Sequence, residues 1–236
     1  MAKSKHSGPL PAAGVKRILD TLAVQHPEAT TELRYRSAYE LLVATILSAQ
    51  CTDALVNRVT PALFHRYPDP RSLARVSSKE LETQIRSTGF FRSKARSLIG
   101  VASALTDRHG GKVPSQIDEL IKLPGVGRKT ANVVLGHALN VPGLAVDRHV
   151  LRVANRLGIA ASDDPTTVEQ QLASRLPPDR WTSASDTLIL HGRRICKPRP
   201  LCEHCAARSD CVFESTRKAS TQVERKRRRT APRFRR

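Results

Sequence analysis

One ten-residue segment, residues 123–132, restricts the fold of this chain more than any other. It reads Leu-Pro-Gly-Val-Gly-Arg-Lys-Thr-Ala-Asn. Pro124 fixes its own φ angle, while Gly125 and Gly127 permit left-handed backbone angles and the close approach of another chain. Successive N–H groups of such a turn can point outward and surround an anion. The segment therefore predicts a tight hairpin that can hold a phosphate-sized group.

Helical sequence flanks the hairpin on both sides. Residues from Arg128 onward favour a helix, whose first N–H groups add positive potential at its start. Before the turn, Ser115 and Asp118 have the spacing of a capping box, and apolar residues follow at core-facing spacing. We therefore expect a helix-hairpin-helix over about residues 115–139. Lys129 would lie in the first turn of the second helix, with its amine near the positive end of the helix dipole.

A carboxylate follows the second helix. After a Pro-Gly break, Asp147 stands at the expected start of another helix. Aspartate in this position is by default an N-cap, whose side chain accepts backbone N–H groups. A lysine and a nearby carboxylate are also the minimum for imine chemistry at a sugar carbon, in which the amine attacks and the carboxylate relays protons. The residues alone leave both roles open for Asp147.

Four of the five cysteines gather near the C-terminal end in the pattern Cys-x5-Cys-x2-Cys-x5-Cys. The N-terminal segment lacks the apolar run of a secretory signal, so we expect a reducing cytosol and metal binding rather than disulfides. Zinc sites usually have two close pairs, whereas one close pair between two single ligands is nearer to iron–sulfur patterns; spacing alone leaves zinc open. Cys51, far upstream, is expected to be a buried apolar residue. The four candidate ligands are Cys196, Cys202, Cys205 and Cys211.

The charge of the chain is strongly positive. Forty Lys and Arg stand against twenty-one Asp and Glu, a formal net charge of +19, which is typical of a phosphate-binding surface. Residues 217–236 contain ten of these basic residues and one acid, with little apolar content. We expect this tail to be disordered and either to attract DNA without sequence preference or only to keep the protein soluble. No segment approaches membrane-spanning length.

Helical periodicity dominates the residues between the tails. Strand-like alternation is scarce, and candidate capping boxes at Ser37, Ser77 and Thr166 each open an apolar stretch at helical spacing. An all-α fold is therefore expected, and two turn-rich segments predict two domains. The expected parts are an N-terminal tail of residues 1–17, a central domain of residues 31–141, a second domain of residues 18–30 plus 142–216, and the basic tail of residues 217–236.

At these residues the chain resembles the endonuclease III family of DNA glycosylases, within the helix-hairpin-helix superfamily. The resemblance runs from about residue 18 to about residue 213. Besides the hairpin and the cysteines, it rests on Thr-Thr-Glu-Leu at 30–33, Leu-Leu-Val-Ala-Thr-Ile-Leu-Ser-Ala-Gln at 41–50, Thr-Gly-Phe-Phe-Arg-Ser-Lys-Ala at 88–95, Val-Asp at 146–147 and Leu-Ile-Leu-His-Gly-Arg at 188–193.

The resemblance implies a fold, a cofactor and an activity. The fold would be the two-domain glycosylase fold with a [4Fe-4S] cluster in a C-terminal loop, held by the four cysteines. The activity would be that of a bifunctional DNA glycosylase and abasic-site lyase, which removes oxidised pyrimidines such as thymine glycol from duplex DNA. The enzyme would then cleave the strand 3′ to the abasic site by β-elimination. It would act as a monomer in the cytoplasm, at the nucleoid if the source is bacterial.

The resemblance also assigns roles to residues. Lys129 stands where the family keeps its Schiff-base nucleophile, and Asp147 where it keeps its catalytic aspartate. Gln50 matches the glutamine that fills the gap left by a flipped nucleotide, and Phe90 matches a hydrophobic wedge that is often leucine. From the residues alone, Phe90 could instead be core, as could its neighbour Phe91, and Gln50 could be a polar residue at a helix end. The expected phosphate contacts are Gly125, Gly127 and Arg128 at the hairpin and Lys197 and Arg199 beside the cysteines.

The chain departs from the family pattern at two points. The family usually has six residues between its first two cluster cysteines, whereas this chain has five, Lys-Pro-Arg-Pro-Leu, which places the cluster geometry in doubt. Arg148 stands where a small threonine is frequent beside the catalytic aspartate, which leaves the substrate range open.

Three other functions fit parts of this pattern. A monofunctional adenine-mismatch glycosylase lacks a lysine at this hairpin position, so Lys129 argues against it. A pyrimidine-dimer glycosylase uses the same lysine chemistry and stays open. A non-enzymatic DNA-binding module would use the hairpin only as a phosphate clamp.

Overall fold

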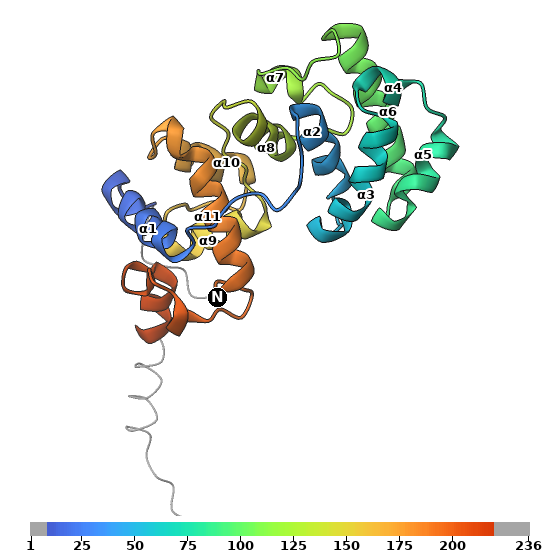
Figure 1. Ribbon diagram of the computed structural model, residues 1–236. Coiled ribbons are helices and arrows are strands. Elements are labelled where there is room, and N and C mark those ends of the chain that lie inside the picture. The colour runs from blue at the N-terminus through green and yellow to red at the C-terminus, as the bar shows by residue number, and fades with distance from the viewer. Residues whose placement is uncertain (1–8, 220–236) are drawn as a thin grey trace, which may run out of the picture. The chain divides into compact units, whose positions relative to one another are not determined.

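A computed structural model describes residues 9–219, and every regular element in that range is a helix (Figure 1). The expected all-α fold is confirmed. The chain divides into two compact units, and each is described by itself. Unit 2 comprises Thr30–Ala145 and Pro178–Thr182, and unit 1 comprises the described residues before 30, Val146–Pro177 and the described residues from 183 onward. None of the described helices is long and apolar enough to cross a membrane.

Unit 2 contains the hairpin and the cluster of buried apolar side chains that supports it. Its elements are α2 (Ala38–Leu47), α3 (Asp53–Arg66), α4 (Pro70–Ala74), α5 (Ser78–Ile85), η1 (Arg86–Thr88), α6 (Phe91–Arg108), α7 (Ile117–Leu120), α8 (Arg128–Ala138) and η2 (Pro178–Arg180).

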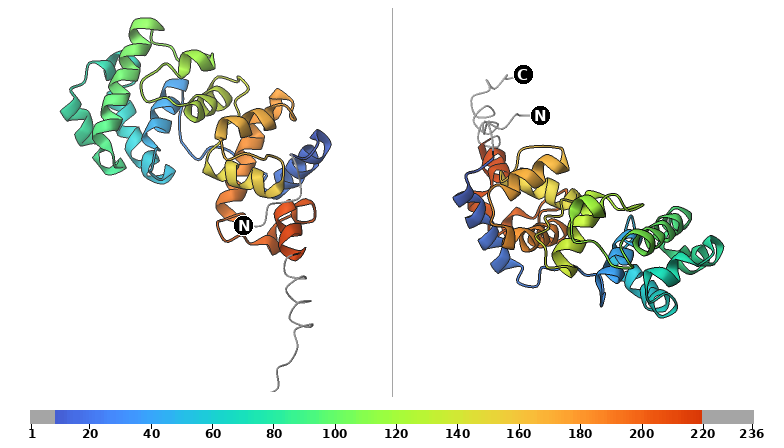
Figure 2. Two further views of the ribbon diagram at one scale, coloured as in Figure 1. Left: turned by 180° about the vertical axis from the view of Figure 1, so that it is seen from behind. Right: turned by 90° about the horizontal axis from the view of Figure 1, so that it is seen from above.

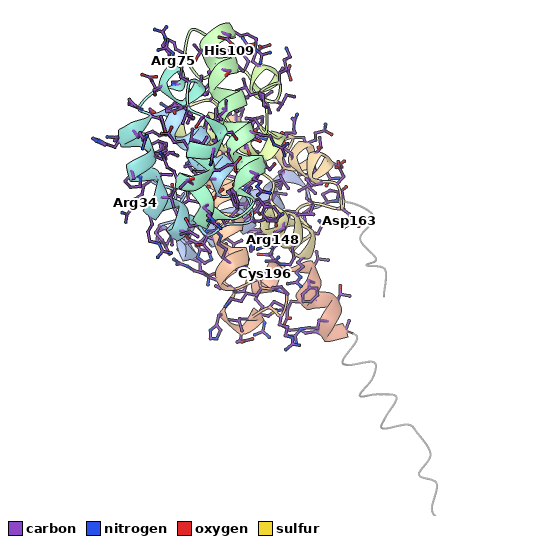
Figure 3. The ribbon with its side chains drawn as sticks, turned by 90° about the vertical axis from the view of Figure 1, so that its right-hand side faces the viewer. Arg34, Arg75, His109, Arg148, Asp163 and Cys196 are labelled. Atoms are coloured by element: carbon purple, nitrogen blue, oxygen red, sulfur yellow. The ribbon has the colours of Figure 1, made fainter. Side chains whose placement is uncertain are left out.

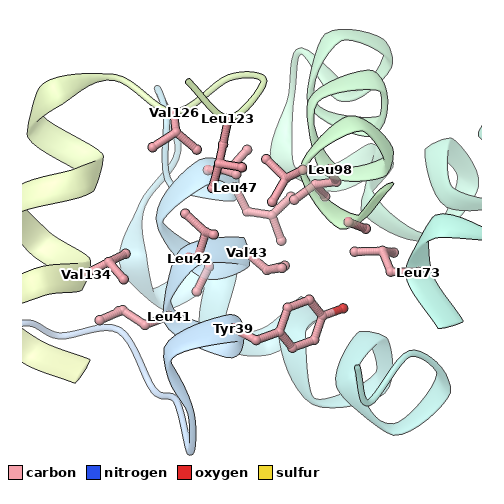
Figure 4. Close-up of a cluster of buried hydrophobic side chains, with 14 of the residues drawn as sticks. Tyr39, Leu41, Leu42, Val43, Leu47, Leu73, Leu98, Leu123, Val126 and Val134 are labelled. Atoms are coloured by element: carbon pink, nitrogen blue, oxygen red, sulfur yellow. The ribbon is translucent and has the colours of Figure 1, made fainter. Parts of the chain in front are cut away.

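Helix α2 is the centre of the core of unit 2. Every residue from Tyr39 to Leu47 is buried, as expected for a helix that is apolar on all sides. Figure 4 shows α2 between the hairpin, whose Leu123 and Val126 lie near Leu47, and the helices on its other side. The core holds the end of α2, the hairpin and α6 together. The loops next to these elements are therefore attached to a closely packed support.

Unit 1 joins segments from both ends of the described chain. Figures 1 and 2 show α1, in blue, beside the C-terminal segment, in red. Two side-chain contacts fix this arrangement: Arg17 forms an ion pair with Asp210 (2.9 Å), and Gln25 donates to the His204 carbonyl oxygen (2.6 Å). The elements of unit 1 are α1 (Ala12–Gln25), α9 (Arg148–Leu157), α10 (Pro165–Ala173), most of α11 (Trp181–Arg194), η3 (Cys202–His204), η4 (Arg208–Asp210) and a final helix of residues 212–219.

The two tails are shorter than the sequence predicted, as far as the structure describes them. Residues 12–17, expected in the N-terminal tail, form the first part of α1, because Val15 continues the buried apolar face of that helix. Arg217, expected in the basic tail, lies in the final helix and donates to the Glu214 carboxylate (2.8 Å). The rest of both tails, residues 1–8 and 220–236, lies outside the described residues.

Two of the expected helix starts are correct. The Ser37 and Ser77 hydroxyl groups cap α2 and α5, and each accepts the backbone N–H three residues further on. This is the bond that an N-cap serine makes.

Two other expected starts are wrong. Helix α10 begins before Thr166, because Asp164 caps it and Pro165 occupies the first helical position, which suits proline. Before the hairpin, Ser115 caps nothing: α7 starts two residues later, with no side-chain cap. The helix before the hairpin therefore exists, but it is a single short turn.

Candidate functional site

The hairpin ends at a helix start that is open to an anion. Gly127 caps α8 without a side chain, and a Cβ at this position would meet no heavy atom within 4 Å. Gly125 has φ +75°, as a left-handed turn requires, whereas Gly127 is extended at φ −92°. Of the two glycines that permit left-handed angles, only Gly125 adopts one. Gly127 therefore provides open space in front of the helix, where N–H groups and the helix dipole favour negative charge.

Lys129 is the second residue of α8. Its side chain is exposed, and it lies in the first turn of the helix, directly after the open space at Gly127. The neighbouring Arg128 is also exposed and adds a second cation to this helix start. A phosphodiester bound at the hairpin would thus lie within one helical turn of a primary amine.

Gln50 and Phe90 share an uncommon backbone conformation. Gln50 has φ +53° in the turn between α2 and α3, and Phe90 has φ +47° at the start of α6. Phe90 is 65% exposed, so its interpretation as a core residue is wrong, while Phe91 packs partly buried against the core. Left-handed angles are costly for residues other than glycine and gather at functional sites. Two exposed side chains held in this way are suited to contact a ligand.

Asp147 is the N-cap of α9. Its Oδ1 accepts the backbone N–H groups of His149 (2.7 Å) and Val150 (2.9 Å), so the capping role considered from the sequence is real. Both bonds use one oxygen and leave Oδ2 with its lone pairs directed elsewhere. Capping and proton transfer are therefore compatible in this carboxylate. Arg148, the first residue of α9, is exposed and is labelled in Figure 3.

Hydrogen bonds connect the start of α9 to the first cysteine. Arg152 donates to His149 Nδ1 (3.1 Å), to the Gly192 carbonyl oxygen (3.0 Å) and to the Cys196 carbonyl oxygen (3.1 Å). Because arginine only donates, Nδ1 of His149 is the acceptor and Nε2 carries the proton of the neutral ring. Burial lowers the pKa of His149, although the nearby Asp147 opposes the shift.

The five-residue loop after Cys196 is held by a second arginine of α9. Arg156 donates to the carbonyl oxygens of Lys197 (2.6 Å) and Pro198 (2.9 Å), and its guanidinium lies 5.0 Å from the centre of the Phe213 ring. Lys197 itself is exposed, as is Arg199 in the same loop. The five-residue spacing is therefore a closed loop with two basic side chains on its outer surface.

All four C-terminal cysteines line one small cavity. Cys196 and Cys211 are buried, and Cys202 and Cys205 are half-buried. Among residues 9–219, no three His, Cys, Asp or Glu side chains lie close enough to bind a single metal ion. A tetrahedral zinc site would need its sulfurs all about 2.3 Å from one point. Four thiols spread around a cavity fit the corners of a multi-iron cluster better.

The thiols need a positive partner to ionise. Burial raises the pKa of Cys205 to about 11, and it also raises the pKa of Cys202 and of Cys211. The thiolate is the form that binds metal, so a cationic iron core would supply the charge that burial withholds. The donor set therefore suits an iron–sulfur cluster. Cys51 is not buried as expected: it is half-buried at the edge of the core of unit 2.

Comparison with known proteins identifies the family. A family model described as HhH-GPD superfamily base excision DNA repair protein matches residues 43–178. Endonuclease III of Synechocystis sp. is 48% identical over 190 residues, which is 80% of this chain and 87% of that protein. Endonuclease III of Bacillus subtilis is 45% identical over 195 residues, which is 82% of this chain and 89% of that protein. The chain belongs to the endonuclease III family.

Solved structures of the family have the same fold. A trapped Endonuclease III–DNA covalent intermediate, an estranged-adenine complex, matches with a TM-score of 0.83 at 44% identity, over 89% of this chain and 99% of that chain. A non-covalent Endonuclease III–DNA complex matches with a TM-score of 0.83 at 43% identity. A thermostable thymine-DNA glycosylase, 22% identical with a TM-score of 0.77, shares the fold. The fold expected from the endonuclease III resemblance is confirmed.

The residues that the resemblance singled out fall on both units. Unit 2 carries Lys129, the hairpin, Gln50 and Phe90, and unit 1 carries Asp147 and the cysteines. Within unit 2, one folded core supports the amine, the hairpin, Gln50 and Phe90. The pairing of Lys129 with Asp147 joins two units and stays a prediction.

Sequence reasoning missed three residues that support these sites. They are Arg152 and Arg156, which hold the segment around the first cysteine, and Lys94, which is buried in unit 2. Arg152 and Arg156 are four residues apart on one helix, a spacing that places them on one face. That spacing could have indicated a shared partner, but nothing in it points to the cysteine loop.

Proposed function

We propose that Lys129 is the nucleophile and Asp147 the proton-relaying carboxylate of a bifunctional DNA glycosylase and abasic-site lyase of base excision repair. Membership of the endonuclease III family carries this proposal, together with the exposed amine at the open start of α8. We further propose oxidised pyrimidines of the thymine glycol class, in duplex DNA, as the substrates. We also propose that the protein acts as a monomer in the cytoplasm, at the nucleoid.

The chemistry begins with the amine. The neutral Lys129 amine attacks C1′ of the flipped nucleotide, and the glycosidic bond breaks as its electron pair leaves with the damaged base. Opening of the sugar ring protonates O4′ and gives an imine between C1′ and Nζ. Loss of a proton from C2′ then breaks the C3′–O bond, and the strand on the 3′ side leaves with its 5′ phosphate. Asp147, through Oδ2, stabilises the positive charge and moves protons.

Two residues of unit 2 provide access to the base. A base in a duplex must leave the stack before its C1′ can be attacked, and unstacking costs a few kcal/mol per base step. Phe90 is the wedge, since an exposed aromatic side chain can occupy the space between base pairs. Gln50 offers an amide, with both donors and acceptors, to the base left without a partner. Gly125, Gly127 and Arg128 hold phosphate at the hairpin.

We propose that Cys196, Cys202, Cys205 and Cys211 hold a [4Fe-4S] cluster. When bound, such a cluster is mainly structural: it fixes the loop that carries Lys197 and Arg199, which contact DNA phosphate. Iron and sulfide analysis of protein purified without oxygen tests this proposal. About four irons and four sulfides per chain support it. One zinc per chain would replace the cluster by a zinc site.

Borohydride trapping tests the enzymatic proposal. The protein is mixed with a duplex that contains one thymine glycol, with an undamaged duplex, and with an abasic duplex, and each mixture is reduced. A covalent adduct on the damaged duplex, lost in Lys129→Gln, is expected. Arg128→Gln is the matched control, because it removes a neighbouring cation and keeps the amine. An adduct on the abasic duplex alone would keep the lyase and reopen the lesion class, including pyrimidine dimers. No adduct with intact DNA binding would favour a monofunctional enzyme or a binding module.

A further inference from the structure

Lys94 is a buried cation that the chemistry above does not use. The residue is 5% exposed, and its Nζ donates to the Thr88 carbonyl oxygen (2.7 Å). Lysine is almost never buried to this extent without a partner, because taking an ammonium group out of water is costly. Burial lowers the pKa of Lys94, while the nearby Cys51 thiol opposes the shift. The free-energy cost of burying this ammonium group suggests that Lys94 has a specific role at its position.

Lys94 closes the turn that presents Phe90. Its backbone N–H donates to the Phe90 carbonyl oxygen (3.0 Å), and its side chain reaches back to the carbonyl of Thr88. Between these two bonds lie Gly89, at φ +68°, and Phe90, at φ +47°. Thr88 is itself 2% exposed, and its hydroxyl donates to the Ile85 carbonyl oxygen (2.8 Å). One residue thus holds both ends of a turn whose backbone is strained.

Phe90 needs such support, because its own contacts hold it weakly. Its side chain is 65% exposed, and it starts α6 without a side-chain cap. A wedge that moves away from DNA on contact cannot separate base pairs, so the turn beneath it must be rigid.

We infer that Lys94 is a positioning residue for base displacement: it anchors the Thr88–Phe90 turn in the geometry that enters DNA. This inference rests on the proposed function. The residue acts through Phe90 and touches neither the substrate nor the reacting atoms.

The test separates opening of the duplex from chemistry. Lys94→Met keeps the length of the side chain and removes the donor. Single-turnover base release is measured on thymine glycol paired with adenine, and on thymine glycol in a one-nucleotide bulge, where the base leaves the stack without a wedge. We expect Lys94→Met to slow release from the paired lesion by about tenfold or more, with little change on the bulge. Lys79→Met, an exposed lysine of α5, is the matched control for the lost charge and should behave as wild type.

A double-mutant cycle tests whether Lys94 acts through Phe90. Phe90→Ala should slow the paired lesion, and adding Lys94→Met should slow it no further, since both changes remove the same action. Equal slowing on the paired and bulged lesions would overturn the inference. So would an unchanged rate on the paired lesion, or additive effects in the cycle.

A binding readout keeps the inference independent of catalysis. 2-Aminopurine is placed opposite the target site, and its fluorescence rises when wild-type protein unstacks it; Lys94→Met should lose that rise at saturating protein. If wild type raises the fluorescence but releases no base from either duplex, the proposed activity fails while the inference stands. Should Lys94→Met fold poorly by circular dichroism, Lys94→Gln keeps a donor for Thr88 and should restore part of the rise. A full rise in a folded Lys94→Met variant would overturn the positioning role.

Discussion

Gly125 of the hairpin lies directly against Ser97 of α6. A Cβ at Gly125 would come within 2.5 Å of Ser97 Oγ and 2.6 Å of Ser97 Cβ, closer than side-chain atoms approach one another. One turn further along α6, a Cβ at Gly100 would come within 3.0 Å of Pro124. The hairpin therefore rests on two small residues of α6, the helix that follows Phe90.

This contact predicts a strong effect of a single methyl group. Gly125→Ala should lower the stability of unit 2 by about 1–3 kcal/mol, because alanine meets Ser97 and is strained at φ +75°. Gly127→Ala should cost less than about 1 kcal/mol, since its φ is ordinary and its surroundings are open. Melting curves of the two variants compare them directly. Equal melting temperatures would show that the hairpin can move away from α6.

The two roles of Asp147 can be separated. Asn caps helices as well as Asp, so Asp147→Asn should keep the fold while slowing base release by about a hundredfold or more. Asp164, which caps α10 of the same unit through Thr167 (2.7 Å), is the matched control. Asp164→Ala should lower the stability by about 1 kcal/mol and leave the activity unchanged. Single-turnover rates and melting temperatures are measured on both, and an unchanged rate in Asp147→Asn would leave Asp147 a helix cap only.

The lowered pKa of His149 predicts a loss of stability in acid. Its pKa in the folded protein is below the ordinary value of 6.5, mainly because the ring is buried. As the pH falls below 6.5, the unfolded chain therefore takes up a proton that the folded chain does not, and stability decreases until the pH passes the folded pKa. Above 6.5 the effect vanishes.

The expected result is a smaller acid loss in a His149 variant. The melting temperature of His149→Gln should fall less than that of wild type between pH 8 and pH 5. His65→Gln, at an exposed position of α3, should follow wild type. Parallel curves for all three proteins would remove His149 from the acid response.

The elements that could be predicted from the sequence are those with strong local signals. The hairpin, the start of α8 at Arg128 and the cap at Asp147 follow from turn glycines and a capping residue, which act within a few residues. The start of α10 was missed because Asp164 caps it ahead of Thr166, and the start of α7 was missed because that helix begins without a side-chain cap. The ammonium of Lys94 beneath Phe90 and the arginines of α9 at the cysteine loop depend on contacts across the fold, which no local pattern encodes.

The basic C-terminal segment predicts a salt-dependent effect. Arg217 is held by Glu214 within the final helix, so a truncation should end after residue 219. This removes eight Lys and Arg and one Glu. If these residues touch phosphate, the truncated protein should bind an undamaged duplex more weakly, and the logarithm of its affinity should fall less steeply with the logarithm of salt. The full chain, measured over the same salt range, is the reference. Identical slopes would leave the tail as a solubility segment.

The contacts of α1 join it to segments that the ribosome makes much later. Its partners are synthesised much later: His26, directly after α1, lies 3.0 Å from His191, and Arg17 contacts Asp210 (2.9 Å), at separations of 165 and 193 residues. Until these residues are synthesised, α1 lacks those contacts, while nearly all of unit 2 can already collapse around α2. A nascent chain that stops before the cysteine segment leaves Arg17 without Asp210 and Gln25 without the His204 carbonyl oxygen.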